Sequence, residues 1–273
     1  MSLEGKLEIY GLTDVGRKRS HNEDSIGSDT SLGLLVLADG MGGYKAGEVA
    51  SAIAVNMILE EVRAGLKRVR PGDTDDESGF SRESMIVRDA IEHANQTIFQ
   101  TAQSQPQCHG MGTTVVTAAF YDNRMTVAHV GDSRLYRMRE ARLEQVTSDH
   151  SLLQELVDKG FYTPEEARKS LNKNLVTRAM GIEREVVPDV QEDMVLPGDV
   201  YLLCSDGLTD QVEDEEIGDI LRECRGNLEE AARTLVQRAN EMGGKDNISV
   251  ILARTLKPFK ARKSWYSRMF DWF

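Results

Sequence analysis

Apolar residues along this chain follow two different periods, and each period predicts a kind of secondary structure. Short apolar or alternating runs bounded by turn residues indicate strands at 5–14, 32–38, 113–120, 124–130, 134–138, 186–195, 199–204 and 247–254. Longer segments with apolar residues at helical spacing predict helices at 46–63, 82–104, 213–223 and 227–242. Residues 151–180 read as a mixture of helix and loop. The run 32–38 is too apolar to have a face toward water.

The apolar faces and turns add detail to this outline. The expected buried face of the first helix is Val49, Ala50, Ile53, Met57 and Ile58, and that of the second is Val87, Ala90, Ile91, Ala94 and Ile98. Tyr121-Asp122-Asn123 is a hairpin signal, and Leu196-Pro197-Gly198-Asp199 joins two further strands. Strands joined by tight turns imply antiparallel pairing, and the long helices must cover the sheets. We therefore expect one α+β domain.

Composition and charge restrict the possible partners and the compartment. The chain has 273 residues and a formal net charge of −12, which argues against a nucleic acid partner. No apolar run approaches the roughly 18 residues that span a bilayer, and the first residues lack the apolar stretch of a secretory signal. The three cysteines are far apart, and none begins a C-x5-R phosphate loop. We expect a cytoplasmic protein without cysteine-nucleophile phosphatase chemistry.

Acidic residues recur beside glycine or asparagine at the ends of the predicted strands. The five segments are Asn22-Glu23-Asp24, Asp39-Gly40, Gly131-Asp132, Ser205-Asp206-Gly207 and Lys245-Asp246-Asn247. Any one of them is most simply a turn. If the strand ends meet, however, the like charges need counter-cations, and hard divalent ions with oxygen ligands would supply them. The scarcity of nearby Cys or His pairs argues against zinc.

The order of these segments resembles the type 2C metal-dependent protein phosphatases, particularly the bacterial branch. The resemblance extends from about residue 8 to residue 254. It rests on the acidic segments above together with Thr13-Asp14-Val15-Gly16, Arg19, Asp39-Gly40-Met41-Gly42-Gly43, Ala46-Gly47-Glu48, Gly110-Met111-Gly112-Thr113-Thr114, His129-Val130-Gly131-Asp132-Ser133-Arg134 and Thr177-Arg178-Ala179-Met180-Gly181. Each segment alone is weak evidence, but together they are specific.

The resemblance implies a four-layer α-β-β-α sandwich, in which two antiparallel sheets are flanked by helices, with residues 1–256 as the catalytic domain. It also implies a centre for two Mg²⁺ or Mn²⁺ ions at one edge. In such a centre Asp39 bridges the ions and the Gly40 carbonyl binds one of them. Further ligands are Asp206 and Asp246, with Glu23 and Asp24 acting through water. Asp132 and Asp206 form a third, looser site.

The implied reaction is attack of a metal-activated water on phosphorus, without a covalent enzyme intermediate. Arg19 matches the family's phosphate-binding arginine, and Arg17 is its nearest rival. Met41 occupies a position where some members carry a histidine acid, and Tyr44 departs from another histidine position. We assign no general acid, because the remaining His129 and His150 read as structural hydrogen-bonding residues.

Two segments leave alternatives open. Residues 150–176 match the mobile flap of bacterial members, although an ordinary solvated helix pair fits almost equally well. Residues 257–273 form a basic and aromatic tail, in which five cationic residues stand against one aspartate. The tail suits docking to a partner or an anionic membrane surface. Alternatively, it folds back over the domain's own apolar surface.

The sequence therefore predicts a phosphatase that hydrolyses phosphoserine and phosphothreonine on proteins, with a cognate Ser/Thr kinase and its substrates as partners. A non-catalytic phosphoprotein-binding module is the first alternative, but Asp39, Asp206 and Asp246 are all present. A partner-switching regulator and a phosphatase of small phosphoesters are the others. The metal centre alone does not select the leaving group.

Overall fold

In the computed structural model, which describes residues 2–43, 46–70, 73–163, 166, 175–224 and 226–259, the strands form two sheets. One sheet has the order β1-β11-β10-β7-β8, and the other has the order β2-β3-β5-β6-β9 with β4 paired to β3. Every pair of neighbouring strands is antiparallel. The strands are β1 Leu7–Asp14, β2 Asp24–Asp29, β3 Leu34–Met41, β4 Gly112–Thr113, β5 Val115–Tyr121, β6 Arg124–Val130, β7 Arg134–Arg139, β8 Arg142–Gln145, β9 Asp189–Met194, β10 Val200–Cys204 and β11 Ile248–Thr255.

The alternation of side chains along the central strands builds three layers of core. In β3, Leu34 and Val36 pack toward α1 and α2, whereas Leu35 points into the space between the sheets. In β11, Val250 packs toward α6 and α7, whereas Ile251 faces the other sheet. Strands β3 and β11 are covered by helices on one face and by the other sheet on the opposite face. Their side chains are therefore apolar on both faces.

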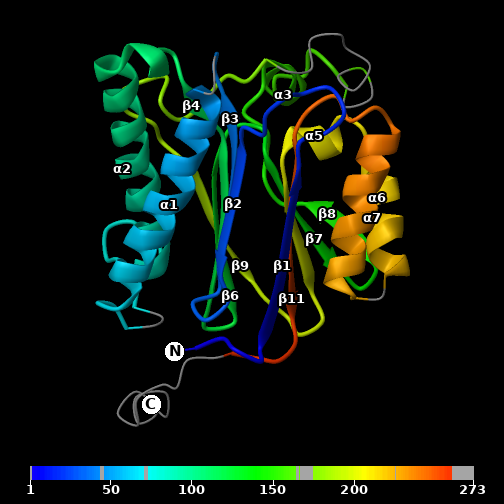
Figure 1. Cartoon of the computed structure of the whole chain (residues 1–273). Coiled ribbons are helices and arrows are strands. Elements are labelled where there is room, and N and C mark those ends of the chain that lie inside the picture. Colours follow the sequence, from blue (N-terminus) through cyan, green and yellow to red (C-terminus); the bar gives the residue numbers. More distant parts are fainter. Residues whose placement is uncertain are drawn as a thin grey trace.

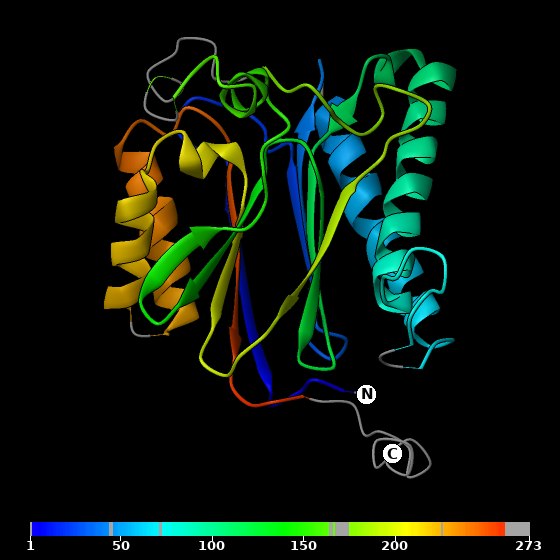
Figure 2. The ribbon, with the colours of Figure 1, turned by 180° about the vertical axis from the view of Figure 1, so that it is seen from behind.

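Helices cover the outer face of each sheet, which gives the predicted four-layer α-β-β-α sandwich (Figures 1 and 2). The helices are α1 Ala46–Leu66, α2 Arg82–Ser104, α3 Leu152–Asp158, α5 Asp206–Thr209, α6 Asp214–Glu223 and α7 Leu228–Glu241, with a 3₁₀ turn at Pro106–Cys108. Helices α1 and α2 pack on the β3 sheet, and α6 and α7 pack on the β11 sheet. Ser81 caps α2 by accepting a hydrogen bond from the Ser84 amide.

Most of the predicted elements are present, with some corrections. The predicted face of α2 is buried throughout, but Val49 on α1 is 38% exposed. The Asp122-Asn123 hairpin has the positive φ angles of a tight two-residue turn. The turn at Leu196–Asp199 does not join paired strands, because β9 pairs with β6 in one sheet and β10 pairs with β7 and β11 in the other.

The start of the tail contacts the domain. Phe259 is 2% exposed, its ring packs edge-on against Phe120, and its amide donates to Asn123 Oδ1 at 2.6 Å. Residues 260–273 and Tyr44 lie outside the described residues, so docking by the tail stays a prediction. Within the described ranges, none of the helices combines the length and apolar character that crossing a membrane requires.

Candidate active site

The predicted acidic residues meet at one edge of the sandwich, where β2 begins and β3 ends. Asp24 begins β2 and lies directly opposite Asp39 near the end of β3. The backbone of Asp39 is held by Thr114, whose amide donates to Asp39 O at 2.8 Å and whose Oγ1 accepts from Asp39 N at 3.1 Å. Strand pairing therefore places two carboxyl groups side by side, that of the buried Asp24 and that of the half-buried Asp39.

Glycines let the other acidic loops approach closely. A Cβ atom on Gly207 would lie 1.9 Å from Asn247 O, so only glycine lets the segment after Asp206 pack against the loop of Asp246. Likewise, a Cβ atom on Gly40 would lie 2.2 Å from Gly47 O. The first contact joins the start of α5 to the loop before β11, and the second joins the end of β3 to the start of α1.

Asn247 and Ser205 tie the acidic segments to one another. Asn247 Oδ1 accepts the Glu23 amide at 2.8 Å, and its Nδ2 donates to Val15 O and His21 O. Ser205 Oγ donates to Asp24 Oδ2 at 2.9 Å. Both residues stand in the acidic segments of the sequence, but their motifs alone carried no indication of these supporting roles.

Burial and mutual repulsion raise the pKa of the clustered carboxyl groups. Burial raises the pKa of Asp24 to about 6 and that of Asp132 to about 6, with repulsion from neighbouring carboxylates adding to burial. The pKa of Asp39 lies well above its usual range, first because of burial and then because of Asp24 and Asp206. The pKa of Asp206 is raised for the same two kinds of reason, with Asp132 as its main charged neighbour.

The side chains at this edge fit divalent cations. Asp24 Oδ1 and Asp206 Oδ1 are buried and accept no hydrogen bond in the part of the chain that the structure describes. A buried carboxylate oxygen without a partner is costly unless a cation compensates it. Oxygen-only donors select hard ions such as Mg²⁺ and Mn²⁺ rather than zinc.

Arg19 lies beside this acidic group and is half exposed. Its Nη2 donates to Asp246 Oδ2 at 2.7 Å, and its side chain is 49% exposed. Burial lowers the pKa of the guanidinium, but Asp246, Glu23 and Asp39 outweigh that effect and raise it. The structure therefore brings Arg19 to the same edge as all the predicted metal ligands.

The comparisons with known proteins agree with this arrangement. The model of the family described as protein phosphatase 2C matches residues 16–248. The chain belongs to the protein phosphatase 2C family.

Several relatives of this phosphatase cover most of its length. It is 37% identical to the serine/threonine phosphatase stp of Listeria welshimeri, over 88% of this chain and 92% of the relative. It is 39% identical to the protein phosphatase PhpP of Streptococcus pneumoniae, over 90% and 96% of the two chains. The crystal structure of the Mycobacterium tuberculosis serine/threonine phosphatase PstP/Ppp superposes with a TM-score of 0.81 at 36% identity, and the match covers 92% of this chain and 100% of that one.

A second set of ligand-type atoms lies behind the site. Atoms of His129, His150 and Asp189 lie within 4.8 Å of one another, whereas no three described acidic side chains at the sheet edge come this close.

These histidines already have hydrogen-bond partners in this phosphatase. His129 Nε2 donates to Ser148 O at 2.8 Å, and His150 Nδ1 accepts the Gly131 amide at 3.0 Å. Asp189 is paired with Arg178 at 2.6 Å, which places a positive charge where a second cation would sit. The two histidines are therefore structural hydrogen-bonding residues, as the sequence predicted.

The raised pKa values predict how stability depends on pH without metal. Above pH 4 the folded chain holds more protons than the unfolded chain, because the pKa values of Asp24 and Asp132 are raised to about 6. The free energy of unfolding in chelator should therefore fall by a few kcal/mol as pH rises from about 4 through 6 and above.

Urea unfolding at pH 5 and pH 8 measures this dependence. Saturating Mn²⁺ should remove this pH dependence, because bound cations neutralise the carboxylates that protons neutralise in chelator. Asp24→Asn should reduce the slope in chelator. Equal stability of the chelated chain at both pH values would contradict the prediction.

Proposed function

We propose that this chain hydrolyses phosphoserine and phosphothreonine on proteins by attack of a water activated at a centre of two Mg²⁺ or Mn²⁺ ions. The observation that carries the proposal is the cluster of carboxyls around Asp39, in which two buried oxygens have no hydrogen-bond partner among the described residues. A solved relative, the catalytic domain of PstP, is described as a complex with 2 manganese ions; its TM-score is 0.78 at 36% identity, and the match covers 92% of this chain and 99% of that chain.

In this proposal Asp39, Asp206, Asp246 and the Gly40 carbonyl hold the two ions, with Glu23 and Asp24 acting through water. Asp132 joins Asp206 in a third site. When bound, the ions lower the pKa of water and neutralise charge on the phosphoryl oxygens.

The remaining chemistry belongs to residues of this chain. Arg19 binds two phosphate oxygens through its guanidinium fork and so orients phosphorus toward the acidic edge. Ser205 holds the Asp24 carboxylate, and Asn247 holds the backbone of Glu23, so this acidic segment is in place before substrate binds.

The metal requirement can be tested directly. We expect hydrolysis of p-nitrophenyl phosphate and of a phosphothreonine peptide with Mn²⁺ or Mg²⁺, and loss of both in chelator. Calorimetric titration of the chelated chain should detect two equivalents of Mn²⁺. Turnover that survived chelation would contradict the proposal.

The proposed partners are phosphoproteins, including a cognate Ser/Thr kinase and its substrates. The proposed location is the cytoplasm, where the three free cysteines would remain reduced. A non-catalytic binding module would need a missing metal aspartate, and this chain has all three.

A further inference from the structure

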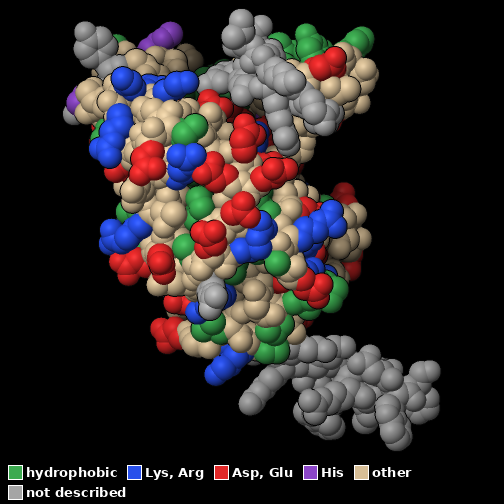
Figure 3. Space-filling model, turned by 90° about the vertical axis from the view of Figure 1, so that its right-hand side faces the viewer, with side chains coloured by type: hydrophobic (Ala, Val, Ile, Leu, Met, Phe, Trp, Pro, Cys, Tyr) green, Lys and Arg blue, Asp and Glu red, His purple; other side chains and the backbone are tan. Residues whose placement is uncertain are grey.

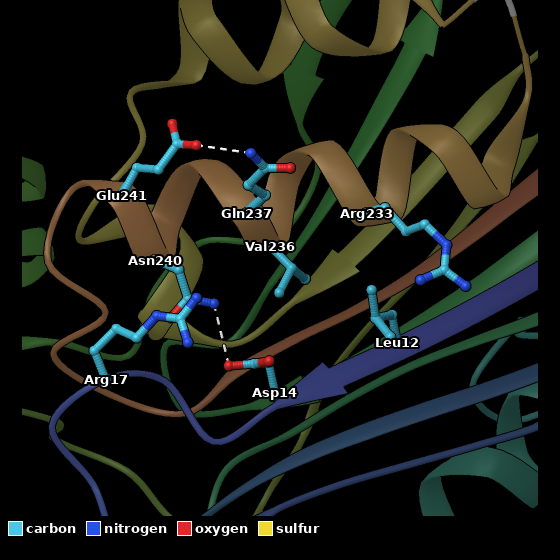
Figure 4. Close-up of a pocket in the computed structure, with 8 residues that line it drawn as sticks. All are labelled: Leu12, Asp14, Arg17, Arg233, Val236, Gln237, Asn240 and Glu241. Carbon is cyan, nitrogen blue, oxygen red and sulfur yellow. Dashed lines mark hydrogen bonds between the residues drawn. The ribbon is translucent and has the colours of Figure 1, made fainter.

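An open groove of about 700 Å³ lies between the end of β1 and helix α7 (Figure 4). Leu12 from β1 and Val236 from α7 supply its apolar part. Arg17 and Arg233 also line it, at different points along the groove. We call it the β1–α7 groove. The neighbouring side of the molecule, the right-hand side in the view of Figure 1, carries acidic and basic side chains in a mixed pattern (Figure 3).

The groove is joined to the active site through the loop that carries Arg17 and Arg19. The amides of Arg17 and Lys18 both donate to Gly244 O, at 2.7 and 3.1 Å. A Cβ atom on Gly16, which has φ +79°, would lie 2.1 Å from Asp246 O. The loop is therefore packed against the chain segment of Asp246. Arg17, which lines the groove, stands two positions in the sequence before Arg19, which forms the ion pair with Asp246.

Packing also places the side chain of Arg17. A Cβ atom on Gly244 would lie 2.7 Å from Arg17 Cγ, so the stem of the arginine runs directly over this glycine. Figure 4 shows the side chain lying beside Asn240 and Asp14. The stem of the side chain is thus fixed beside the groove, while Arg17 as a whole remains exposed to solvent.

Arg17 differs from the other charged residues of the groove because it has no ion-pair partner among the described residues. Arg233 is paired with Glu229 at 2.9 Å, and Glu241 accepts a hydrogen bond from Gln237 at 2.8 Å. Asp14 accepts hydrogen bonds from the Gly16 amide and from Asn240. The charge of Arg17 is therefore available to a ligand.

We propose that the β1–α7 groove binds the segment of the phosphoprotein substrate next to its phosphorylated residue, and that Arg17 selects segments with a carboxylate there. The inference rests on the proposed phosphatase function. Charge decides the occupant: the chain's own tail, residues 257–273, carries five cationic residues against one aspartate and would be repelled by Arg17. An acidic segment whose phosphate is held by Arg19 would meet Arg17 next.

The experiment compares phosphothreonine peptides that differ only in one Glu or Gln, placed in turn at each position flanking the phosphothreonine. For the wild type with Mn²⁺, we expect kcat/KM to favour the Glu peptide by up to about fivefold at the best position, the upper end of what an exposed ion pair contributes. The preference should lie in KM and should shrink with added salt. Arg17→Gln should abolish it, and Arg17→Glu should reverse it.

Lys18→Gln is the matched control, because Lys18 is an adjacent exposed cation that does not line the groove. It should keep the wild-type preference, and thermal melting should show that all variants fold. The proposal is overturned if Arg17→Gln keeps the preference or if Lys18→Gln loses it equally. A wild-type enzyme that hydrolysed neither peptide would instead overturn the proposed phosphatase function, and the groove proposal with it.

Discussion

Replacing Asp39 by asparagine is expected to lower kcat by at least about a thousandfold. Asp39 faces four acidic neighbours, since Asp24, Asp206, Asp132 and Asp246 all act on it. An amide oxygen is neutral and binds a divalent cation far less strongly than a carboxylate does. The loss should affect p-nitrophenyl phosphate and a phosphothreonine peptide equally, because the metal centre serves both.

The same substitution should make the chelated chain more stable. Asp39 lies among other carboxyls and its pKa is raised well above the usual range by burial and by their repulsion, so its charge opposes folding when no cation is present. We expect the Tm of Asp39→Asn in chelator to exceed that of the wild type, and its rise on adding Mn²⁺ to be much smaller. A general folding defect would lower both Tm values.

Asp29→Asn is the matched control for this variant. Asp29 lies at the other end of β2 and pairs with Arg63 at 3.0 Å, away from the acidic edge. Its loss should cost about 1 kcal/mol of stability or less and leave the response to Mn²⁺ intact. The assigned metal centre is wrong if Asp39→Asn behaves like Asp29→Asn in kcat, in the Tm in chelator and in the rise of Tm on adding Mn²⁺.

The elements that the sequence predicted well are those with strong periodicity. The range 82–104 for α2 and the range 124–130 for β6 agree with the structure, because each segment has a clear apolar face and a clear turn or cap at its end. Strand β2 was not predicted, since Asp24–Asp29 is mostly polar and has no period of two. It is a strand because β3 pairs with it, and Gly27 leaves room for Val55 and Leu59 of α1.

The Leu196–Asp199 turn shows what local sequence does not encode. Its proline and glycine predict a reversal of the chain, but not which sheet the next strand joins. That choice depends on long-range contacts, including Gly198 N to Thr255 O at 2.8 Å and the Arg139–Asp199 ion pair at 2.7 Å. Residues distant in sequence decide that β10 pairs with β7 and β11.

In the site, too, some residues can be identified from local sequence motifs, whereas others depend on contacts between residues distant in sequence. The acidic residues could be named from motifs, because each stands beside a glycine or asparagine at a strand end. The residues that hold them in place, Thr114, Ser205 and Asn247, act through hydrogen bonds across as many as 224 positions of sequence. Their roles depend on the register of β3 and on the packing of β11, which no local pattern specifies.

Replacing Arg19 by lysine is expected to lower kcat/KM by about ten- to a hundredfold, and replacing it by alanine by more. Lysine keeps the positive charge but loses the planar fork that grips two phosphate oxygens. Arg19 already donates to Asp246 Oδ2 at 2.7 Å, so one edge of its guanidinium is committed and the other is left for phosphate. A lysine ammonium could satisfy either Asp246 or the phosphate, but not both in the same geometry.

The inhibition constant of inorganic phosphate reports phosphate binding separately from kcat. Arg19→Lys should weaken inhibition by phosphate whichever substrate is used. Arg17→Gln should leave this inhibition unchanged and raise KM only for peptides with a flanking carboxylate. Lys18→Gln should change neither the inhibition nor the KM. The two arginines are thereby separated, since one binds the group common to all substrates and the other binds a neighbour that only some substrates carry. If Arg19→Lys kept both turnover and phosphate inhibition within twofold of the wild type, the role of Arg19 would be confined to its ion pair with Asp246, and another group would have to bind the phosphate.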